Sequence, residues 1–357
     1  MNNTTLTDYP ATQIIDQYVT PVIVIIGLPG NILSLIIWMQ KRMRHSSGYY
    51  LAALALDDLI FLLLSIVFEI HNTWHIKILD VPVLCEAFPV VFLPTQYLSP
   101  FFVLAFTTER YISICHPFKR EKYCTIKRAK IVIISLVVFV LCLCSPMGYF
   151  FTMAEDCTLR KTVLDGYPKS VYNIYTLTMD LFCFFLVPMT VLVMNILVIV
   201  ELRRLTRMES AQLHGSPQRT AATTVTLLAV SFYQIFTTLP VSIVYTLFME
   251  FVVEDGETDP IVYKRHYTYN LVMAIIKEYG ITHYAFNFLI YIITGKMFRQ
   301  ELRRLLLRPF SKLGLTLTRD YTSLTGSTRV ANESSRKWVS TNGNHKEPKS
   351  VADETLL

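Results

Sequence analysis

The chain has 357 residues, of which 52% are hydrophobic and only 17% are charged, and its mean hydropathy is +0.41. Soluble proteins carry about a quarter of their residues as charged side chains, so this composition excludes an ordinary soluble protein. The net charge of +6 does not indicate nucleic-acid binding, because the basic residues follow a pattern of membrane topology.

Apolar stretches of about 20 residues, the length that crosses a bilayer, recur along the whole sequence. They predict seven membrane-spanning helices at residues 20–40, 48–70, 86–115, 129–151, 171–200, 221–249 and 267–294. The predicted fold class is an all-α membrane protein, a seven-helix transmembrane bundle over residues 20–294. A short amphipathic helix at the membrane surface follows at residues 295–310.

Lys and Arg are distributed unevenly between the two ends of this bundle. Residues 1–19 contain neither, whereas the loops on the opposite side and the tail are rich in both. The positive-inside rule therefore places residues 1–19 outside the cell and the tail, residues 311–357, in the cytoplasm. The tail is rich in Ser, Thr, Asn and charge, so we expect it to be disordered. We expect the first span to act as its own insertion signal and the protein to reach the plasma membrane.

Two overlapping glycosylation sequons open the chain, at Asn2 and Asn3, on the predicted outer side. In the first span, Asn31 lies among Ile and Leu residues. Its amide needs a partner on another helix because lipid offers none. We interpret it as a structural hydrogen bond.

The second and third spans carry the charges that are hardest to place in lipid. Asp57 and Asp58 are adjacent carboxylates near mid-membrane, so at least one of them must face the bundle interior or water. The third span closes on Glu109-Arg110-Tyr111, and a basic loop follows at once. A charged pair at the end of a membrane helix is costly, which indicates function.

Seven cysteines are present, but the sequence contains no CxxC pair and no Cys/His cluster that would indicate a metal site. Cys85 and Cys157 are the only two on the oxidising side of the predicted topology, so we predict a disulfide between them. We expect the other five to be reduced: Cys115, Cys124, Cys142, Cys144 and Cys183.

The last spans and the tail carry further polar signals. Asp180 lies in the fifth span, and Lys277 and Glu278 lie in the seventh. After Gly295, basic and apolar positions alternate in a pattern typical of a helix that contacts membrane lipid. At the chain's end, Thr355 and Leu357 match the ligand pattern of a PDZ domain, a pattern short enough to arise by chance.

Taken together, these residues resemble the rhodopsin-like (class A) G-protein-coupled receptors over roughly residues 20–310. The most specific part of the resemblance is Cys85 followed at a fixed distance by Arg110 in Glu-Arg-Tyr. Other family positions fall on the spans where the family has them: Asp58, Pro188, Pro240, Asn287, Tyr291 and Phe298.

The resemblance implies an output site at the inner end of the bundle. Glu109 would hold Arg110 in the resting state, and Arg110, followed by Tyr111, would turn to engage a heterotrimeric G protein. Asn287 and Tyr291 would form a switch in the seventh span. Arrestin and a receptor kinase would act on the tail.

The resemblance also implies two features nearer the outside. Asp58 would be the carboxylate of an interior sodium pocket, with Ser99 and Asn31 as polar neighbours, and we expect no other cofactor. The bridge between Cys85 and Cys157 would pin the outer loop over the ligand entrance.

Five positions depart from the family pattern: Ile196, Gln234, Thr238, His283 and Phe288. They replace residues that in the family usually transmit the signal from the ligand to the G protein. His283 also replaces an asparagine of the family's sodium pocket. The resemblance therefore does not carry the usual relay over to this chain. It leaves Glu109-Arg110-Tyr111 unaffected.

Two single positions argue against an amine receptor and a photoreceptor. Phe92 stands where amine receptors have an aspartate, and Ile281 stands where photoreceptors have the lysine that binds retinal. The variant motifs around Thr238 and Phe288 resemble invertebrate FMRFamide and myosuppressin receptors, which implies an amidated, cationic neuropeptide. The candidate ligand-binding residues are Glu69, Phe92, Gln96, Asp180, Lys277 and Glu278.

Two alternatives stay open for the acids and two for the function. Glu69 or Asp180 would bind a ligand arginine through charge-assisted hydrogen bonds, or these acids would pair internally with Lys277 or His71. The ligand could instead be a small molecule or a lipid, or the chain could be a transporter, although no inverted repeats are evident. No phosphate loop, metal-ligand spacing or nucleophile elbow appears, so we do not expect an enzyme.

Overall fold

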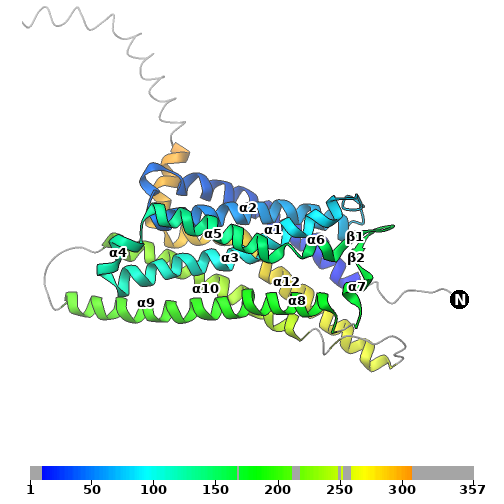
Figure 1. Ribbon diagram of the computed structural model, residues 1–357. Helices are drawn as coiled ribbons and strands as arrows, with labels where there is room; N and C mark the ends of the chain where they lie inside the picture. The colour runs from blue at the N-terminus through cyan, green and yellow to red at the C-terminus, as the bar shows by residue number, and fades with distance from the viewer. Residues whose placement is uncertain (1–9, 167–168, 211–217, 248–250, 252–258, 308–357) are drawn as a thin grey trace, which may run out of the picture. The chain divides into compact units, whose positions relative to one another are not determined.

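The computed structural model of the chain describes residues 10–166, 169–210, 218–247, 251 and 259–307. Long helices run side by side, with a short hairpin at one end (Figure 1). Residue contacts divide the chain into two units, Met1–Leu302 and Arg303–Leu357, and the fold described below is that of the first.

The first unit is built almost entirely of helices. Its long helices are α1 (Pro10–Trp38), α2 (Ser46–Asn72), α3 (Leu84–Cys115), α5 (Ile126–Cys144), α8 (Val171–Asp180), α9 (Val187–Ser210), α10 (Gln218–Thr246) and α12 (Pro260–Thr294). A π-helical segment, η2 (Leu181–Leu186), joins α8 to α9 without a break. The short elements are η1 (Lys41–Met43), α4 (Pro117–Tyr123), α6 (Met147–Phe150), β1 (Phe151–Met153), β2 (Cys157–Leu159) and α7 (Lys161–Leu164).

Six helical segments among the described residues are long and apolar enough to cross a membrane. They are Ala11–Trp38, Ser46–Asn72, Leu84–Cys115, Ile126–Phe150, Val171–Met208 and Thr224–Thr246. The seventh helix of the predicted bundle is α12, which has 35 residues but is less apolar because charged and polar residues interrupt it. Glu278, His283 and Asn287 of α12 are all buried, so its polar positions face other helices.

Several helices extend beyond the predicted spans. α1 begins at Pro10, ten residues before the predicted start at residue 20, and α9 continues to Ser210. The extra turns of α1 are polar and pack against neighbouring helices: Gln13 Nε2 donates to the backbone carbonyl of Thr73 at 3.3 Å. A prediction from apolar runs ends where polarity begins, so it misses helical turns of this kind.

Close contact between α1, α2 and α12 depends on a glycine. A Cβ added to Gly27 would lie 2.5 Å from Leu62 Cδ1 and 2.9 Å from Ala285 Cβ, so a larger residue would force the helices apart. One turn later, Asn31 Nδ2 donates to the backbone carbonyl of Tyr284 at 2.6 Å. Asn31 therefore forms the interhelix hydrogen bond that we inferred from its apolar surroundings.

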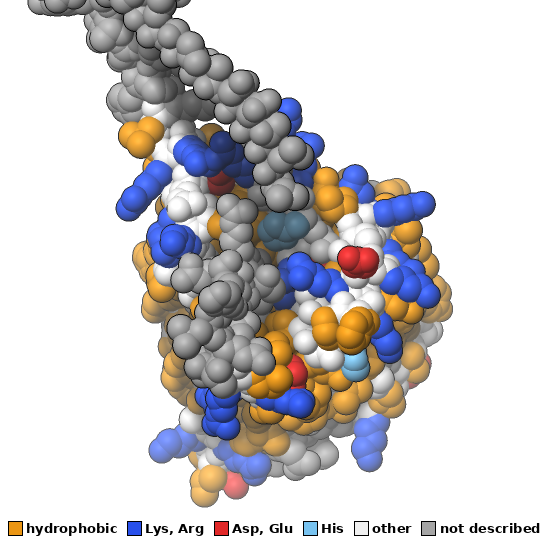
Figure 2. All heavy atoms as spheres, turned by 90° about the vertical axis from the view of Figure 1, so that its left-hand side faces the viewer, with side chains coloured by type: hydrophobic (Ala, Val, Ile, Leu, Met, Phe, Trp, Pro, Cys, Tyr) orange, Lys and Arg blue, Asp and Glu red, His pale blue; other side chains and the backbone are white. Residues whose placement is uncertain are grey.

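Lys and Arg side chains gather at the end of the bundle that carries α4 and the start of α5 (Figure 2). This is the end that the charge pattern predicts to be cytoplasmic. After Gly295 the chain is again helical over residues 296–307. The predicted tail at 311–357, with Thr355 and Leu357, and the sequons at Asn2 and Asn3 lie outside the described residues.

Candidate functional site

A cavity of about 520 Å³ opens between α2, α3, α8, α10 and α12, and Phe151 and Cys157 of the β1–β2 hairpin also line it. Cavities that bind small ligands have volumes of about 300–1,000 Å³. The lining combines aromatic rings with a few polar side chains, and this combination is typical of a site that orients its ligand.

The hairpin is held at this end of the bundle by a disulfide and by an acid. Cys85 and Cys157 are bonded, with their Cα atoms 5.5 Å apart, which confirms the predicted bridge. The backbone N–H of Cys157 also donates to Asp80 Oδ1 at 2.7 Å. Nearby, Lys77 pairs with Asp156 and thereby lowers the pKa of that carboxyl group. The hairpin is therefore fixed by covalent and polar contacts together.

One wall of the cavity is aromatic. The rings of Phe61, Phe68 and Phe88 lie nearly parallel to the ring of Phe92, with centroids 5.8, 5.2 and 5.3 Å away. Tyr284 stacks on Phe61 at 3.7 Å. Phe92 is thus the centre of an apolar surface, and it offers no charge to a ligand ammonium.

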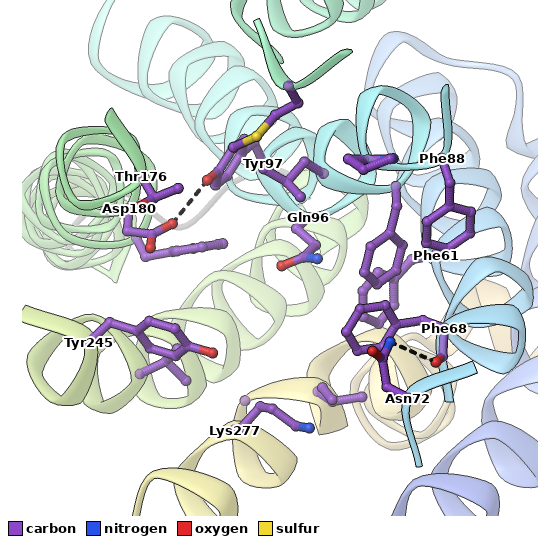
Figure 3. Close-up of a pocket in the computed structure, with 18 of the residues that line it drawn as sticks. Phe61, Phe68, Asn72, Phe88, Gln96, Tyr97, Thr176, Asp180, Tyr245 and Lys277 are labelled. Atoms are coloured by element: carbon purple, nitrogen blue, oxygen red, sulfur yellow. Dashed lines mark hydrogen bonds between the residues drawn. The ribbon is translucent and has the colours of Figure 1, made fainter. Parts of the chain in front are cut away.

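The opposite wall carries an acid (Figure 3). The hydroxyl of Tyr97 donates to Asp180 Oδ1 at 3.0 Å, and no described residue forms an ion pair with Asp180. Gln96 projects from α3 into the space between the two walls. Two of the candidate ligand-binding residues, Gln96 and Asp180, therefore line the cavity.

Lys277 also lines the cavity, but acids behind it engage its charge. Lys277 Nζ lies 3.1 Å from Asp16 Oδ1 and 3.8 Å from Glu278 Oε1. Glu69 accepts a hydrogen bond from the hydroxyl of Thr73. Neither Glu69 nor Glu278 is among the cavity-lining residues. The partner Asp16 was missed from the sequence because it lies outside the predicted first span.

The charged pair at the C-terminal end of α3 is held by the start of α2. Glu109 is buried, and its Oε1 accepts hydrogen bonds from the hydroxyls of Ser46 at 2.8 Å and Ser47 at 2.7 Å. Arg110 Nη2 lies 3.7 Å from Glu109 Oε1 and donates to the hydroxyl of Ser47. Sequence reasoning paired Glu109 with Arg110 but missed both serines. The two serines directly follow the first basic loop, and this position was the sequence signal that could have placed them near Glu109.

The cap of α2 belongs to the same cluster. The backbone N–H of Gly48 donates to His45 Nδ1 at 3.0 Å. Burial, with a smaller effect of the Arg110 charge, lowers the pKa of His45 to about 4, so this side chain is neutral at physiological pH. Tyr111 packs edge-on against His116, with the ring centroids 5.5 Å apart.

The seventh helix contacts the predicted interior carboxylate. Asn287 Nδ2 donates to Asp58 Oδ2 at 2.8 Å. Tyr291 is fully buried between Trp38 and Phe298, at centroid distances of 5.3 Å from each. α12 is thereby joined to α2 through an amide–carboxylate bond and to α1 through aromatic packing.

The other residues expected near Asp58 use their hydrogen bonds elsewhere. The hydroxyl of Ser99 accepts a hydrogen bond from Gln234 Nε2 at 2.9 Å, which connects α3 to α10. Asn31 donates to backbone carbonyls. Asp58 Oδ1 is buried and has no hydrogen-bond partner within the described part of the chain. The link from Gln234 to Ser99 was not predicted from the sequence.

The structure thus has a ligand-sized cavity at one end of the helical bundle and the Glu109–Arg110 pair at the other. A sequence profile described as "7 transmembrane receptor (rhodopsin family)" matches residues 30–291. The chain belongs to this family. As in other rhodopsin-family proteins, its polypeptide is a receptor chain with several membrane-spanning helices.

Individual receptors match this chain at moderate sequence identity and over part of its length. The thyrotropin-releasing hormone receptor of Mus musculus is 36% identical over 207 residues, which are 53% of this chain and 50% of that protein. Neuromedin-U receptor 2 of Rattus norvegicus is 28% identical over 302 residues, 79% of this chain and 72% of that protein. The chain spans about half the length of the thyrotropin-releasing hormone receptors that it matches.

Proposed function

We propose that this rhodopsin-family receptor binds an extracellular, cationic, amidated neuropeptide in the cavity and activates a heterotrimeric G protein at the inner end of the bundle. Its relatives are named as receptors for thyrotropin-releasing hormone and for neuromedin-U, which supports a peptide ligand. The resemblance to FMRFamide and myosuppressin receptors supports peptides that end in Arg-Phe-amide as the first candidates.

Asp180 is the observation that carries this proposal. Its side chain lies on the cavity wall, one oxygen accepts a hydrogen bond from Tyr97, and no described cation pairs with it. A carboxylate held away from water without a cation is costly. A ligand guanidinium or ammonium would remove that cost and form charge-assisted hydrogen bonds.

The acids around Lys277 support the same ligand charge. Lys277 Nζ lies 3.1 Å from Asp16 Oδ1 and 3.8 Å from Glu278 Oε1, so acids already engage its charge and it offers little attraction to a ligand anion. A ligand carboxylate would have to compete with Asp16 for Lys277.

At the inner end, we infer that ligand binding shifts an equilibrium between two arrangements of the bundle. In the arrangement described here, Ser47 and Glu109 hold Arg110. Release of Arg110 would expose it to the G protein. An arrestin and a receptor kinase would recognise the activated receptor, and a PDZ protein would bind the end of the tail.

The placement in the cell follows from the two ends of the bundle. We propose that the receptor lies in the plasma membrane with its N-terminus outside and its C-terminus in the cytoplasm. The disulfide at the cavity end fits the oxidising exterior, and the basic residues at the other end fit the cytoplasmic side.

The proposal is tested with neutral replacements on both sides of the predicted ion pair. Asp180→Asn should reduce the potency of an arginine-containing amidated peptide by about tenfold or more, the size of one buried charge-assisted contact. The same peptide with citrulline in place of arginine should lose potency on the wild-type receptor but lose little more on the variant. The measurement is peptide-stimulated nucleotide exchange at matched surface expression.

Asp165→Asn is the matched control, because Asp165 is exposed and is not among the cavity-lining residues. Glu69→Gln should have a smaller effect than Asp180→Asn, since Glu69 does not line the cavity. Equal potency of the arginine peptide on wild type and Asp180→Asn would rule out Asp180 as the cation site.

A further inference from the structure

Gln96 occupies the centre of the cavity, with the acid of Asp180 on one side and the aromatic wall on the other (Figure 3). Its backbone is fixed, because its carbonyl accepts a hydrogen bond from the hydroxyl of Tyr284 at 3.2 Å. Its side-chain amide makes no hydrogen bond with any described residue, whereas the neighbours Thr95 and Tyr97 both have partners. An amide with one acceptor and two donors is thus presented to whatever enters the cavity.

The chemistry of this group selects its complement. A carboxamide offers both a donor and an acceptor, so it can form two hydrogen bonds with Gln96 at once. A carboxylate offers only acceptors, and its charge would need a cation. Lys277 is the only Lys or Arg among the described cavity-lining residues, and Asp16 already lies 3.1 Å from it. A buried carboxylate at Gln96 would therefore be unpaired and costly.

We propose that Gln96 is the residue that distinguishes a ligand carboxamide from the corresponding carboxylic acid. This inference rests on the proposed function and deepens it, because it assigns the recognition of the amide group to one side chain. The carboxamide comes either from an amidated C-terminus or from an Asn or Gln side chain of the ligand.

The aromatic wall supports this placement. Phe68 lies on the side of the cavity away from Asp180. The ring of Phe92 stacks with it, and the two ring centroids are 5.2 Å apart. A ligand whose cation pairs with Asp180 and whose apolar group packs on these rings must cross the middle of the cavity. Its polar backbone or terminal group then meets Gln96.

The test uses two synthetic tetrapeptide libraries that share Arg-Phe at their last two positions, one with a C-terminal amide and one with the free acid. On the wild-type receptor, the amide library should stimulate nucleotide exchange at concentrations at least about tenfold lower than the acid library, the size of one net hydrogen bond. A third library with a free acid end and Asn or Gln side chains distinguishes the second source of a carboxamide.

Two variants locate the discrimination. Gln96→Leu removes both hydrogen-bonding groups and should reduce the amide-to-acid ratio toward one. Gln96→Arg supplies a cation and should invert the preference in favour of the acid. Gln40→Leu is the control, because the Gln40 amide donates to Ile36 O at the inner end of α1 and is remote from the cavity lining.

Each outcome has a separate meaning. A ratio that is unchanged in Gln96→Leu and Gln96→Arg, at matched surface expression, would overturn the role of Gln96. Equal activity of amide and acid libraries on the wild type would overturn it as well, while leaving a peptide receptor in place. Failure of every library to stimulate exchange would count against the proposed function itself, and the inference would fall with it.

Discussion

The hydroxyl of Ser47 donates a hydrogen bond to Glu109 across 2.7 Å, and this bond ties the start of α2 to the end of α3. The same hydroxyl accepts a hydrogen bond from Arg110. Ser47 therefore lies between the two charges that, on the proposed mechanism, separate when Arg110 engages a G protein. The proposed resting state would depend on α2 as much as on the pairing of Glu109 with Arg110.

Replacing both serines, Ser46→Ala with Ser47→Ala, should raise basal nucleotide exchange about tenfold. Hydrogen bonds to charged groups contribute about 1.5–3 kcal/mol each, and the loss of bonds made only at rest shifts the equilibrium toward the active arrangement. Ser145→Ala is the control, since Ser145 is exposed and donates only to the backbone of Cys142. Unchanged basal exchange at equal expression would show that the serines do not restrain Arg110.

Gln234 and Ser99 form a second restraint, this time between α10 and α3. The bond between them is 2.9 Å long and buried, and Thr238, which lines the cavity one turn away, donates to the backbone carbonyl of Gln234. Gln234→Leu and Ser99→Ala should each raise basal nucleotide exchange severalfold. Because both remove the same bond, basal exchange of the double variant should be close to that of either single variant. Tyr233→Phe, which removes a bond from α10 to α12 instead, is the control. Strictly additive effects would contradict a shared bond.

A sodium ion at Asp58 is a proposal that rests on one buried carboxylate oxygen. Asp58 Oδ1 has no hydrogen-bond partner within the described residues, and hard cations prefer oxygen ligands. Asn31 Oδ1 is likewise buried without a hydrogen-bond partner among the described residues, whereas the Ser99 hydroxyl already accepts a bond from Gln234. Agonist affinity should fall severalfold in sodium chloride relative to N-methylglucamine chloride of equal ionic strength, and Asp58→Asn should abolish the difference. Identical salt dependence in both receptors would exclude a sodium site at Asp58.

His45 predicts a loss of stability in mild acid. The folded pKa of about 4 lies below the unfolded value of about 6.5, so the neutral cap stabilises the folded state fully above pH 6.5 and progressively less as the pH falls toward 4. His45→Asn keeps a capping acceptor without a titrating group. Thermal unfolding of the solubilised receptor at pH 7.5 and 5.5 should therefore show a larger decrease for wild type than for the variant. Equal decreases would show that His45 is not the titrating cap.

The long apolar runs of the chain predicted most of the fold. Runs of Ile, Leu, Val and Phe located the helices because membrane-length apolar segments have few other stable structures. Cys85 and Cys157 were paired only because both fall on the predicted outer side of the membrane, and the structure confirms this bond. Burial of Asn31 also followed from its position in a membrane-length helix.

The sequence could not predict how each helix is rotated against its neighbours. Glu69 and Asp180 were equivalent candidates, yet only Asp180 faces the cavity. Lys277 was expected to pair with Glu278, Glu69 or a ligand carboxylate. Glu278 lies 3.8 Å from its Nζ, but the nearest acid is Asp16 on α1, at 3.1 Å. Contacts between residues far apart in the chain depend on helix crossing and register, which local patterns do not specify.

The central claim is that a peptide in the cavity activates a G protein through Arg110. Its most direct test is nucleotide exchange by heterotrimeric G protein in membranes that contain either the wild-type receptor or Arg110→Ala, challenged with a panel of amidated, arginine-containing peptides. We predict that at least one peptide stimulates exchange with the wild type and that Arg110→Ala, at equal surface expression and peptide binding, does not. Normal stimulation by Arg110→Ala, or solute uptake by the wild type without any exchange, would contradict this account.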